Sequence, residues 1–507
     1  MLLIDFGALW ALTYLLVGRL NLIAAIGEKA ALAFALALGL KSLMLFGWMA
    51  SVGEFPEPLM QTGLSFGALV LVLILRRRLR VHSILPSRAP EKKSLPVIAL
   101  VIILGILFLL SLASASFFPI TEADGIWYHI KGMVFLHEGA FDSETIVSQF
   151  RQYPPFLSLL FAYLGSFDFG NVKVVFPFFY LFLLVIFYFR VHSFAKSKNI
   201  ASAFTLILGT TPYFWWHSTL PFLDLTTGFY YSIGVMFWFS LIQSVCKRGT
   251  PEARESNPLA LAFLSGTLLG LAAWNRLEFL LYDAIPLLIL IYALDGNTTL
   301  EKKEKNIILL CLVVPLLFFS TLWCLTLTNF DSPLERRVLA VGLVGMGMWA
   351  LVFLNLKLSF NFNRKQLIGM GALAAVLYLA LMVVGGPQRV SLGKALMITS
   401  IRSISVHVFY MGTSFLALFL FREKLRSLSQ PVKLLGWLLI FYPLVHFLIF
   451  SYSEPKWTEI STYLKVLWVH PGHSINLSDT RGMLAFYPIL LFFIAGLPVI
   501  KRGFENE

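Results

Sequence analysis

Long apolar runs recur along the whole 507-residue chain, and short breaks between them carry most of the charges. Several runs reach the roughly 20 residues that an α-helix needs to cross the hydrocarbon core of a bilayer. Charged residues make up only 13% of the sequence, against about 25% in soluble domains, which excludes a water-soluble enzyme. Continuous apolar runs also lack the alternation of a transmembrane barrel. The sequence therefore predicts an all-α polytopic membrane protein.

The apolar runs predict about fifteen transmembrane helices. The first run lacks a basic leading region and a small-residue cleavage site, so we interpret it as a retained span. The predicted spans are 2–18, 29–50, 58–75, 95–118, 174–190, 200–214, 221–245, 258–275, 279–294, 307–328, 338–356, 367–385, 405–421, 434–451 and 483–500.

The chain has 40 Lys and Arg residues against 27 Asp and Glu residues, a net charge of +13. Most of the basic residues lie in one set of alternate loops. The positive-inside rule makes that set cytoplasmic, so the positive charge requires no nucleic-acid partner. The opposite side carries three substantial segments, 119–173, 386–404 and 452–482. We therefore expect a protein of the cytoplasmic (inner) membrane whose chemistry faces the periplasm or the exterior.

The first outer segment, 119–173, places Glu122 and Asp124 just beyond the end of a span. A carboxylate at this boundary can take a proton from an acceptor hydroxyl, because surroundings of low dielectric raise its pKa towards a useful value. The sequence ADGIWYHIKGMVFLHEG also has the acidic start and the glycine stop of a helix, so Asp124 could instead cap that helix. The apolar stretch after the Tyr-Pro-Pro at 153–155 is too short to cross a membrane and is expected at the interface.

The order and spacing of residues in this segment resemble the GT-C superfamily, the integral-membrane glycosyltransferases that take sugars from polyprenyl-phosphate carriers. Bacterial members carry an acid in the first outer loop, an aromatic residue shortly after it, a small helix that ends in glycine, and a Pro-Pro element that opens an apolar helix. The matching residues here are Asp124, Tyr128, His129, Gly139 and the stretch YPPFL at 153–157. The resemblance is clearest over 95–295.

This resemblance implies that Asp124 is catalytic and that Tyr128 and His129 bind substrate. Many members carry a second acid beside the first, whereas Gly125 follows Asp124 here, so the second acid is either Glu122 or absent.

The resemblance also implies a division of the chain into three parts. Residues 95–300 would form the GT-C-like catalytic core with its outer loop 119–173. Many relatives have one span before this loop, whereas here three further spans, all within 1–94, precede the span at 95–118, so 1–94 is expected to be an N-terminal transmembrane module. Residues 301–507, with the outer loop 452–482, would form a C-terminal transmembrane module.

Ionisable groups in or near spans are costly and are functional candidates by default. Asp224 begins a predicted span, where by resemblance an acid approaches the first-loop site; alternatively it offsets the helix dipole. Arg276 and Glu278 lie in a tight outer turn, and relatives often carry an Arg followed two residues later by an acid there. Arg276 could bind the carrier phosphate, or it could pair with Glu278 and shape the turn.

The last outer segment contains Lys456 and, immediately before the final span, Arg481. The family commonly has a basic residue followed by a Pro-containing helix at this place, so we expect both residues to bind substrate. The alternative for Arg481 is an anchor at the membrane interface. His470 and His473 are separated by a Pro-Gly pair that opposes a helical metal pair, so no zinc site is predicted.

The predicted function is transfer of a sugar from a polyprenyl-phosphate-linked donor to a lipid, glycan or protein acceptor, with inversion expected from the resemblance. Asp124 would act as general base, Arg276 and Arg481 would hold the departing phosphate, and Asp224 and Glu122 would shape the acceptor pocket. No nucleotide-binding motif is present, and no metal ligand set is predicted, although a divalent cation could assist. The alternatives are an O-antigen-ligase-type glycan transferase and a transporter or flippase of lipid-linked saccharides.

Overall fold

The computed structural model describes residues 1–78, 95–247, 257–326, 428–453 and 483–500, together with positions 345 and 347 and without 21, 24, 142, 152 and 499. Within these ranges the chain is helical and contains no strand. Eight of the helices are long and apolar enough to cross a membrane. The described residues therefore have the all-α, multi-spanning architecture that the sequence predicts.

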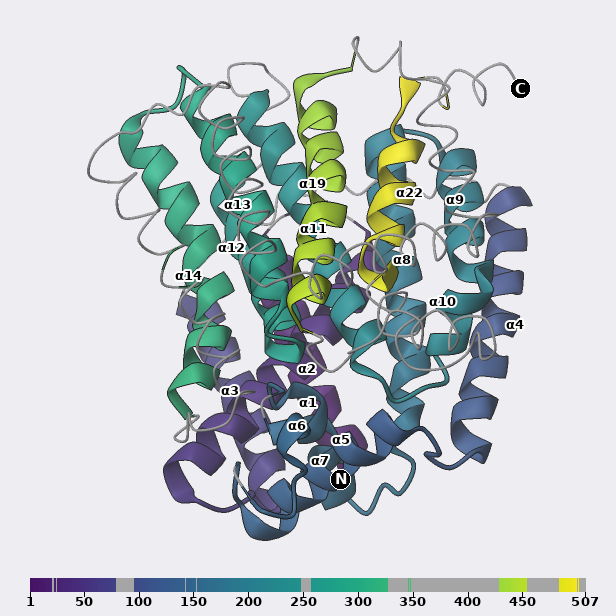
Figure 1. Ribbon diagram of the computed structural model, residues 1–507, viewed down its shortest axis with the longest axis vertical. Helices are drawn as coiled ribbons and strands as arrows, with labels where there is room; N and C mark the ends of the chain where they lie inside the picture. Colours follow the sequence, from purple (N-terminus) through teal and green to yellow (C-terminus); the bar gives the residue numbers. More distant parts are fainter. Residues whose placement is uncertain are drawn as a thin grey trace, which may run out of the picture.

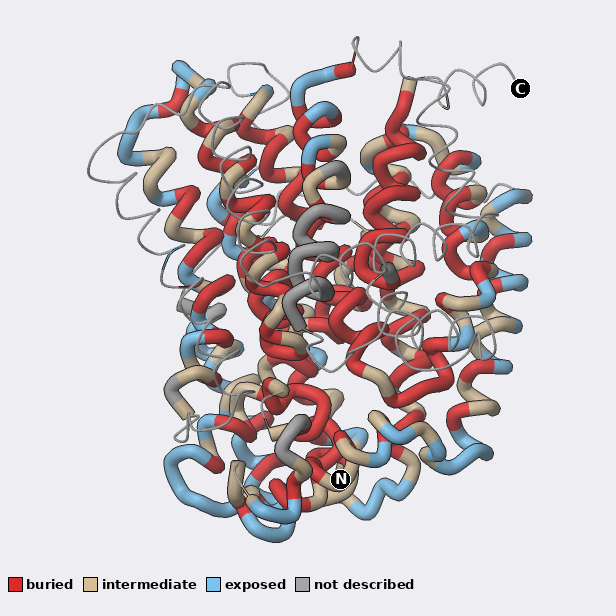
Figure 2. Tube along the Cα trace, in the orientation of Figure 1, coloured by how far each residue is buried: buried red, intermediate tan, exposed pale blue. Residues whose placement is uncertain are grey.

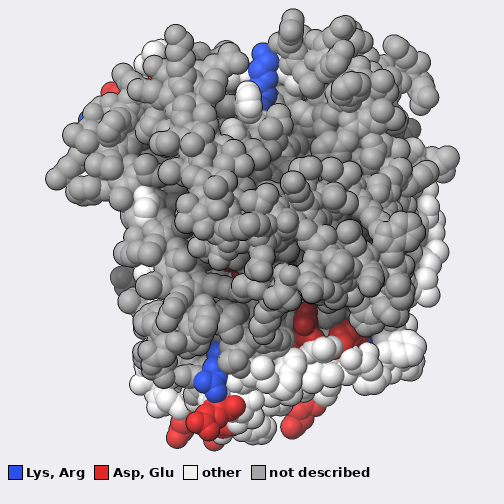
Figure 3. Space-filling model, in the orientation of Figure 1, with Lys and Arg blue, Asp and Glu red and all other residues white. Residues whose placement is uncertain are grey.

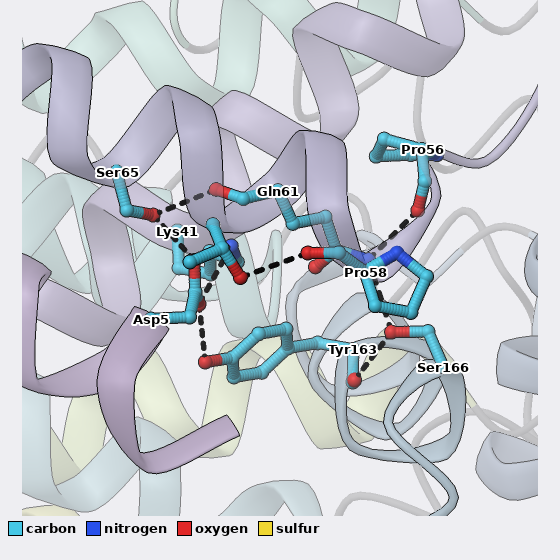
Figure 4. Close-up of polar contacts among 9 residues, drawn as sticks. Asp5, Lys41, Pro56, Pro58, Gln61, Ser65, Tyr163 and Ser166 are labelled. Carbon is cyan, nitrogen blue, oxygen red and sulfur yellow. Dashed lines mark hydrogen bonds and ion pairs between the residues drawn. The ribbon is translucent and has the colours of Figure 1, made fainter. Parts of the chain in front are cut away.

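The chain begins with three helices that pack against one another, α1 (Leu2–Arg19), α2 (Ile26–Val52) and α3 (Pro58–Arg78). Asp5 of α1 joins them, because its carboxylate accepts hydrogen bonds from Lys41 of α2 and Ser65 of α3 (Figure 4). The fourth helix, α4 (Leu95–Phe117), leads into the segment that carries the candidate acids.

Short helices fill the segment after α4, and each is below the roughly 20 residues that a span requires. They are α5 (Ala123–Glu138), α6 (Ser148–Arg151), α7 (Phe156–Ser166) and the 3-10 turn η1 (Val172–Val174). α5 packs closely along α7, since a Cβ on Gly132 would lie only 2.7 Å from the carbonyl oxygen of Ser158. These elements gather at the end of the molecule where the N terminus lies (Figure 1). We call them the α5–α7 layer.

The other described helices form the main bundle, in which α11 is central. Nearly every residue of α11 is buried, and the helix packs against α8, α12, α13, α19 and the last helical segments. Figure 2 shows buried residues throughout this bundle and exposed residues at the periphery. The bundle comprises α8 (Val175–Ala195), α9 (Lys198–Thr210), α10 (Pro212–His217), α11 (Leu223–Cys246), α12 (Pro258–Asn275), α13 (Phe279–Asp295), α14 (Lys302–Thr326), α19 (Gln430–Ser453), η5 (Met483–Ala485) and α22 (Tyr487–Ala495).

The N-terminal helices join this bundle through α2. The Tyr230 hydroxyl of α11 donates to the Ala35 carbonyl at 2.8 Å, and the Trp274 indole of α12 donates to the Ser42 hydroxyl at 3.2 Å. All four residues are buried, so α2 shares the core that holds α11 and α12.

Wherever the described residues cover a predicted span, a helix is present, and most boundaries differ by only a few residues. The exception is 200–214, where α9 ends at Thr210 and α10 begins at Pro212. Proline has no N–H to continue the helical hydrogen bonds, and it favours an extended residue before it, which is the conformation of Thr211. The expected spans at 338–356, 367–385 and 405–421 lie outside the described residues.

Candidate functional site

The first turn of α5 carries the acids that the sequence singles out. Glu122 occupies the N-cap position without a side-chain capping hydrogen bond, and Asp124 lies within the first turn. The helix ends at Gly139, whose φ of 65° is the left-handed conformation typical of a glycine stop. The expected helix, with its acidic first turn and its glycine stop, is therefore confirmed, although Glu122 and not Asp124 occupies the N-cap position. Acidic side chains gather at this end of the molecule (Figure 3).

Gly125 allows the start of α5 to lie against the loop that precedes α11. A Cβ on Gly125 would lie 2.4 Å from Cγ of Pro221 and 3.1 Å from Cγ2 of Ile120. Interiors are close-packed, so no larger side chain fits there without displacing the loop. This contact explains why no second acid follows Asp124, and it brings the start of α5 close to the start of α11.

Asp224 and Arg276 form an ion pair between α11 and α12. Asp224 lies in the first turn of α11, and Nη1 of Arg276 donates to its Oδ1 at 2.7 Å. A second link joins the same two helices, since the Thr226 hydroxyl donates to Oδ1 of Asn275 at 2.9 Å. Glu278 is more distant, with 4.0 Å between its Oε2 and Nε of Arg276. The main contact of Arg276 is thus Asp224, and the local pair with Glu278 is secondary.

The Arg276 guanidinium keeps a donor that the ion pair does not use. Its side chain is 19% exposed. Nε is itself buried and has no hydrogen-bond partner within the described part of the chain, although Oε2 of Glu278 lies 4.0 Å from it. Burial lowers the pKa of Arg276, but the charges of Asp224 and Glu278 outweigh burial and raise it. A guanidinium that stays charged and has a spare N–H donor is suited to bind an anionic group.

Two tyrosines of the α5–α7 layer lie close to this ion pair. The rings of Tyr128 and Tyr153 pack edge to face with their centroids 5.8 Å apart. Burial is the main cause that raises the pKa of both phenols, Asp124 and Asp224 also raise it, and Arg276 opposes them; together these effects bring the pKa of Tyr153 to about 12. Asp124 and Arg276 are therefore both within electrostatic reach of the same two phenols. The candidate site comprises Asp124, Tyr128, Tyr153, Asp224 and Arg276.

Two other predicted residues of the α5–α7 layer have different surroundings. Oε1 of Glu122 lies 3.9 Å from Nζ of Lys173, and the same Nζ donates to the Pro119 carbonyl. Glu122 and Lys173 therefore stabilise the loop that precedes α5. The His129 ring packs edge to face on Phe161, and burial lowers its pKa. Its Nδ1 has no hydrogen-bond partner among the described residues.

Lys456 and Arg481 lie outside the described residues. The chain is described again from Met483, and η5 lies against α11. A Cβ on Gly228 would be 3.1 Å from the backbone of Leu484, and Gly228 is one helical turn along α11 from Asp224. The segment that follows Arg481 in the sequence thus packs beside the helix that carries the ion pair.

The sequence alone assigned no role to Asn275, Thr226 or Lys131, and it treated Tyr153 only as part of a motif. Asn275 directly precedes Arg276 at the end of an apolar run. An amide side chain at such a place is expected to find a hydrogen-bond partner, and this could have marked Asn275 in the sequence. Tyr153 was marked by the Pro-Pro that follows it, but its closeness to Arg276 depends on tertiary packing.

No group of three or more His, Cys, Asp or Glu side chains that could hold a metal ion occurs among the described residues. Comparison with protein-family models, with curated proteins and with solved structures finds no match to this chain.

Proposed function

We propose that this protein is a membrane glycosyltransferase that moves a sugar from a polyprenyl-phosphate donor to an acceptor hydroxyl at the outer face of the cytoplasmic membrane. One observation carries the proposal: Asp124, the Asp224–Arg276 pair and two phenols converge from three distant segments. Displacement of a phosphate requires a proton acceptor and a stabiliser of the leaving group, and Asp124 and Arg276 are the residues proposed for these two roles.

In the proposed reaction Asp124 takes the proton of the acceptor hydroxyl as its oxygen attacks the anomeric carbon. The bond from that carbon to the carrier-phosphate oxygen breaks, and its electron pair stays on the phosphate. Arg276 stabilises the phosphate through the charge of its partly exposed guanidinium, while Asp224 keeps the guanidinium oriented. Attack opposite the leaving group inverts the anomeric configuration, and Asp124 then releases its proton to solvent.

The finer features of the fold belong to the same proposal. We infer about fifteen spans, with a GT-C-like core at 95–300 and the α5–α7 layer on the periplasmic or exterior side. The layer of short helices between α4 and α8 supports this view, because interfacial elements between two spans can present residues to both lipid and water. Arg481 and Lys456 would add positive charge for the phosphate, and a divalent cation could assist.

The proposal is tested with the purified full-length protein in lipid nanodiscs. A panel of radiolabelled polyprenyl-phosphate hexoses and pentoses is offered together with lipid, glycan and peptide acceptors. We expect transfer from one donor, and the Asp124→Asn variant should transfer at least about a hundredfold more slowly, as for loss of a general base.

The matched control is Asp168→Asn, the same change at an exposed acid of the α5–α7 layer. Asp168 has a φ of 57°, which asparagine also tolerates, so this variant should keep full activity. Undiminished transfer by Asp124→Asn would remove Asp124 from the mechanism. No transfer from any donor of the panel would contradict the proposed function.

A further inference from the structure

Lys131 of α5 is a fully buried cation, with a side chain that is 0% exposed. Its Nζ donates to the backbone carbonyls of Phe150 at 3.0 Å, Arg151 at 3.3 Å and Tyr153 at 2.6 Å. An ammonium group has three N–H donors and no acceptor. Three carbonyls of one short stretch of chain thus converge on one lysine.

Aromatic rings complete the surroundings of this ammonium group. Nζ lies 5.1 Å from the ring centroid of Trp323 on α14 and 5.7 Å from that of Phe135 on α5. Ring faces and carbonyl oxygens both carry partial negative charge, so they offset part of the cost of burying the cation. Lys131 therefore connects α5 and the main bundle to the chain around α6.

Lys131 supplies a donor to carbonyls at and just after the end of α6, where the Phe150 carbonyl also accepts from the Tyr153 amide at 3.3 Å. Phe150 and Arg151 end the four-residue helix α6, and the last carbonyls of a helix have no partner within it. Tyr153 lies just beyond, before two prolines that have no N–H to donate. Without the Nζ group these carbonyls lose the donor that fixes the path of the chain into α7.

Tyr153 is where this stretch meets the candidate site. Its ring packs against Tyr128 and Phe150, and Arg276 and Glu278 both act on the ionisation of its phenol. Burial raises the pKa of Tyr153 to about 12, so the phenol keeps its proton, and can donate it in a hydrogen bond, at any pH at which the protein would work.

We propose that Lys131 is a positioning residue which, by holding three carbonyls, presents the Tyr153 hydroxyl as a second donor to the lipid-linked phosphate that Arg276 binds. This inference deepens the proposed function and rests on it. It assigns Tyr153 to phosphate binding and assigns Lys131 to keeping Tyr153 in place.

The test uses the full chain in nanodiscs and two independent measurements. Hydrogen exchange followed by mass spectrometry reports the amides between 146 and 153, and titration with undecaprenyl phosphate reports binding of the carrier. In Lys131→Met, these amides should exchange at least about tenfold faster because the turn is released, while the peptide covering α7 should be unchanged. The Kd for undecaprenyl phosphate should rise about tenfold or more, as for loss of a hydrogen bond to a charged group.

Tyr153→Phe separates the two steps of the inference. It should raise the same Kd by a similar factor but leave the exchange of the 146–153 amides unchanged. Lys173→Met is the matched control for exchange, because Lys173 is also a buried lysine of this layer that donates to a backbone carbonyl. It should not change the exchange of the 146–153 amides.

Each outcome decides one point. Unchanged exchange in Lys131→Met overturns the positioning role, whatever the effect on binding. If the 146–153 amides exchange faster in Lys131→Met but the Kd is unchanged in both Lys131→Met and Tyr153→Phe, the assignment of Tyr153 to phosphate binding is overturned. If Lys131→Met does not fold, Lys131→Gln gives the exchange measurement and Tyr153→Phe the binding measurement. If the wild type binds no undecaprenyl phosphate, the proposed function fails, while the exchange contrast still tests whether Lys131 holds the turn.

Discussion

Two buried ion pairs, Asp5–Lys41 and Asp224–Arg276, have the same charges but different surroundings. Asp5 is 0% exposed and Lys41 2%. Both carboxylate oxygens of Asp5 are used, since Lys41 and the Ser65 hydroxyl donate to Oδ1, and the Tyr163 hydroxyl of α7 donates to Oδ2 (Figure 4). Four helices thus meet at one carboxylate.

Arg276, by contrast, is 19% exposed, and its Nε has no hydrogen-bond partner in the described ranges. The phenols near it, Tyr128 and Tyr153, belong to the α5–α7 layer. A saturated pair can fix helices together, but it offers no group to a ligand. A pair with a spare donor is less well satisfied in the free protein and can bind an anion. The comparison therefore indicates that Asp5–Lys41 joins helices, and it supports the proposal that Asp224–Arg276 takes part in binding the phosphate.

The largest expected effect concerns the saturated pair. Asp5→Asn leaves the ammonium group of Lys41 buried without its carboxylate, which should cost about 3–5 kcal/mol of unfolding free energy. Adding Lys41→Met should restore most of that stability, because no charge is left unpaired. The asparagine carbonyl can still accept from Ser65, and its NH2 group, which replaces Oδ2, can donate to the Tyr163 oxygen. Thermal unfolding of both variants in detergent measures the difference. A double variant as unstable as Asp5→Asn would contradict the assembly role.

The second effect concerns the pair with the spare donor. Arg276→Gln should slow transfer by about a hundredfold to a thousandfold, as when a donor to a developing anion is lost. Adding Asp224→Asn removes the unpaired charge and should recover stability but not transfer. Arg276→Lys keeps the charge without the planar set of donors, and should therefore be intermediate. Steady-state kinetics and thermal unfolding on the same samples separate the two properties.

The opposite result for the double variant would change this assignment. Recovery of transfer together with stability would mean that the Asp224–Arg276 pair, like the Asp5 pair, serves only to join helices.

Much of the helical architecture could be predicted from the sequence, because apolar length is a local property. α12 was predicted at its observed bounds, and the helix of the first outer loop was predicted together with its glycine stop. The break after Thr210 was missed because the apolar run continues across it, although Pro212 was visible in the sequence.

The candidate site could be predicted less completely. Asp124, Asp224 and Arg276 stood out because charges beside apolar runs are costly, but their partners could not be read from spacing. Asp5 and Lys41 were left without a role, because their pairing depends on how α1 and α2 are aligned side by side, which the sequence does not show. Lys131 was assigned no role, because a lysine whose partners are backbone carbonyls has no acidic partner that a charge pattern would show.

Gly125→Ala gives the smallest expected effect and tests what the site needs beyond its ion pair. The added Cβ would meet Cγ of Pro221 at 2.4 Å, so α5 must shift and move Asp124 relative to the pair. A displacement of this kind should slow transfer by about tenfold to a hundredfold. The protein should stay folded, because the contacts of Asp5 with Lys41, Ser65 and Tyr163 are unchanged. Gly170→Ala is the control, because no heavy atom lies within 4 Å of a Cβ there. If Gly125→Ala transfers as fast as the control, the docking of α5 against the start of α11 does not matter for the reaction, and the ion pair alone would have to account for it.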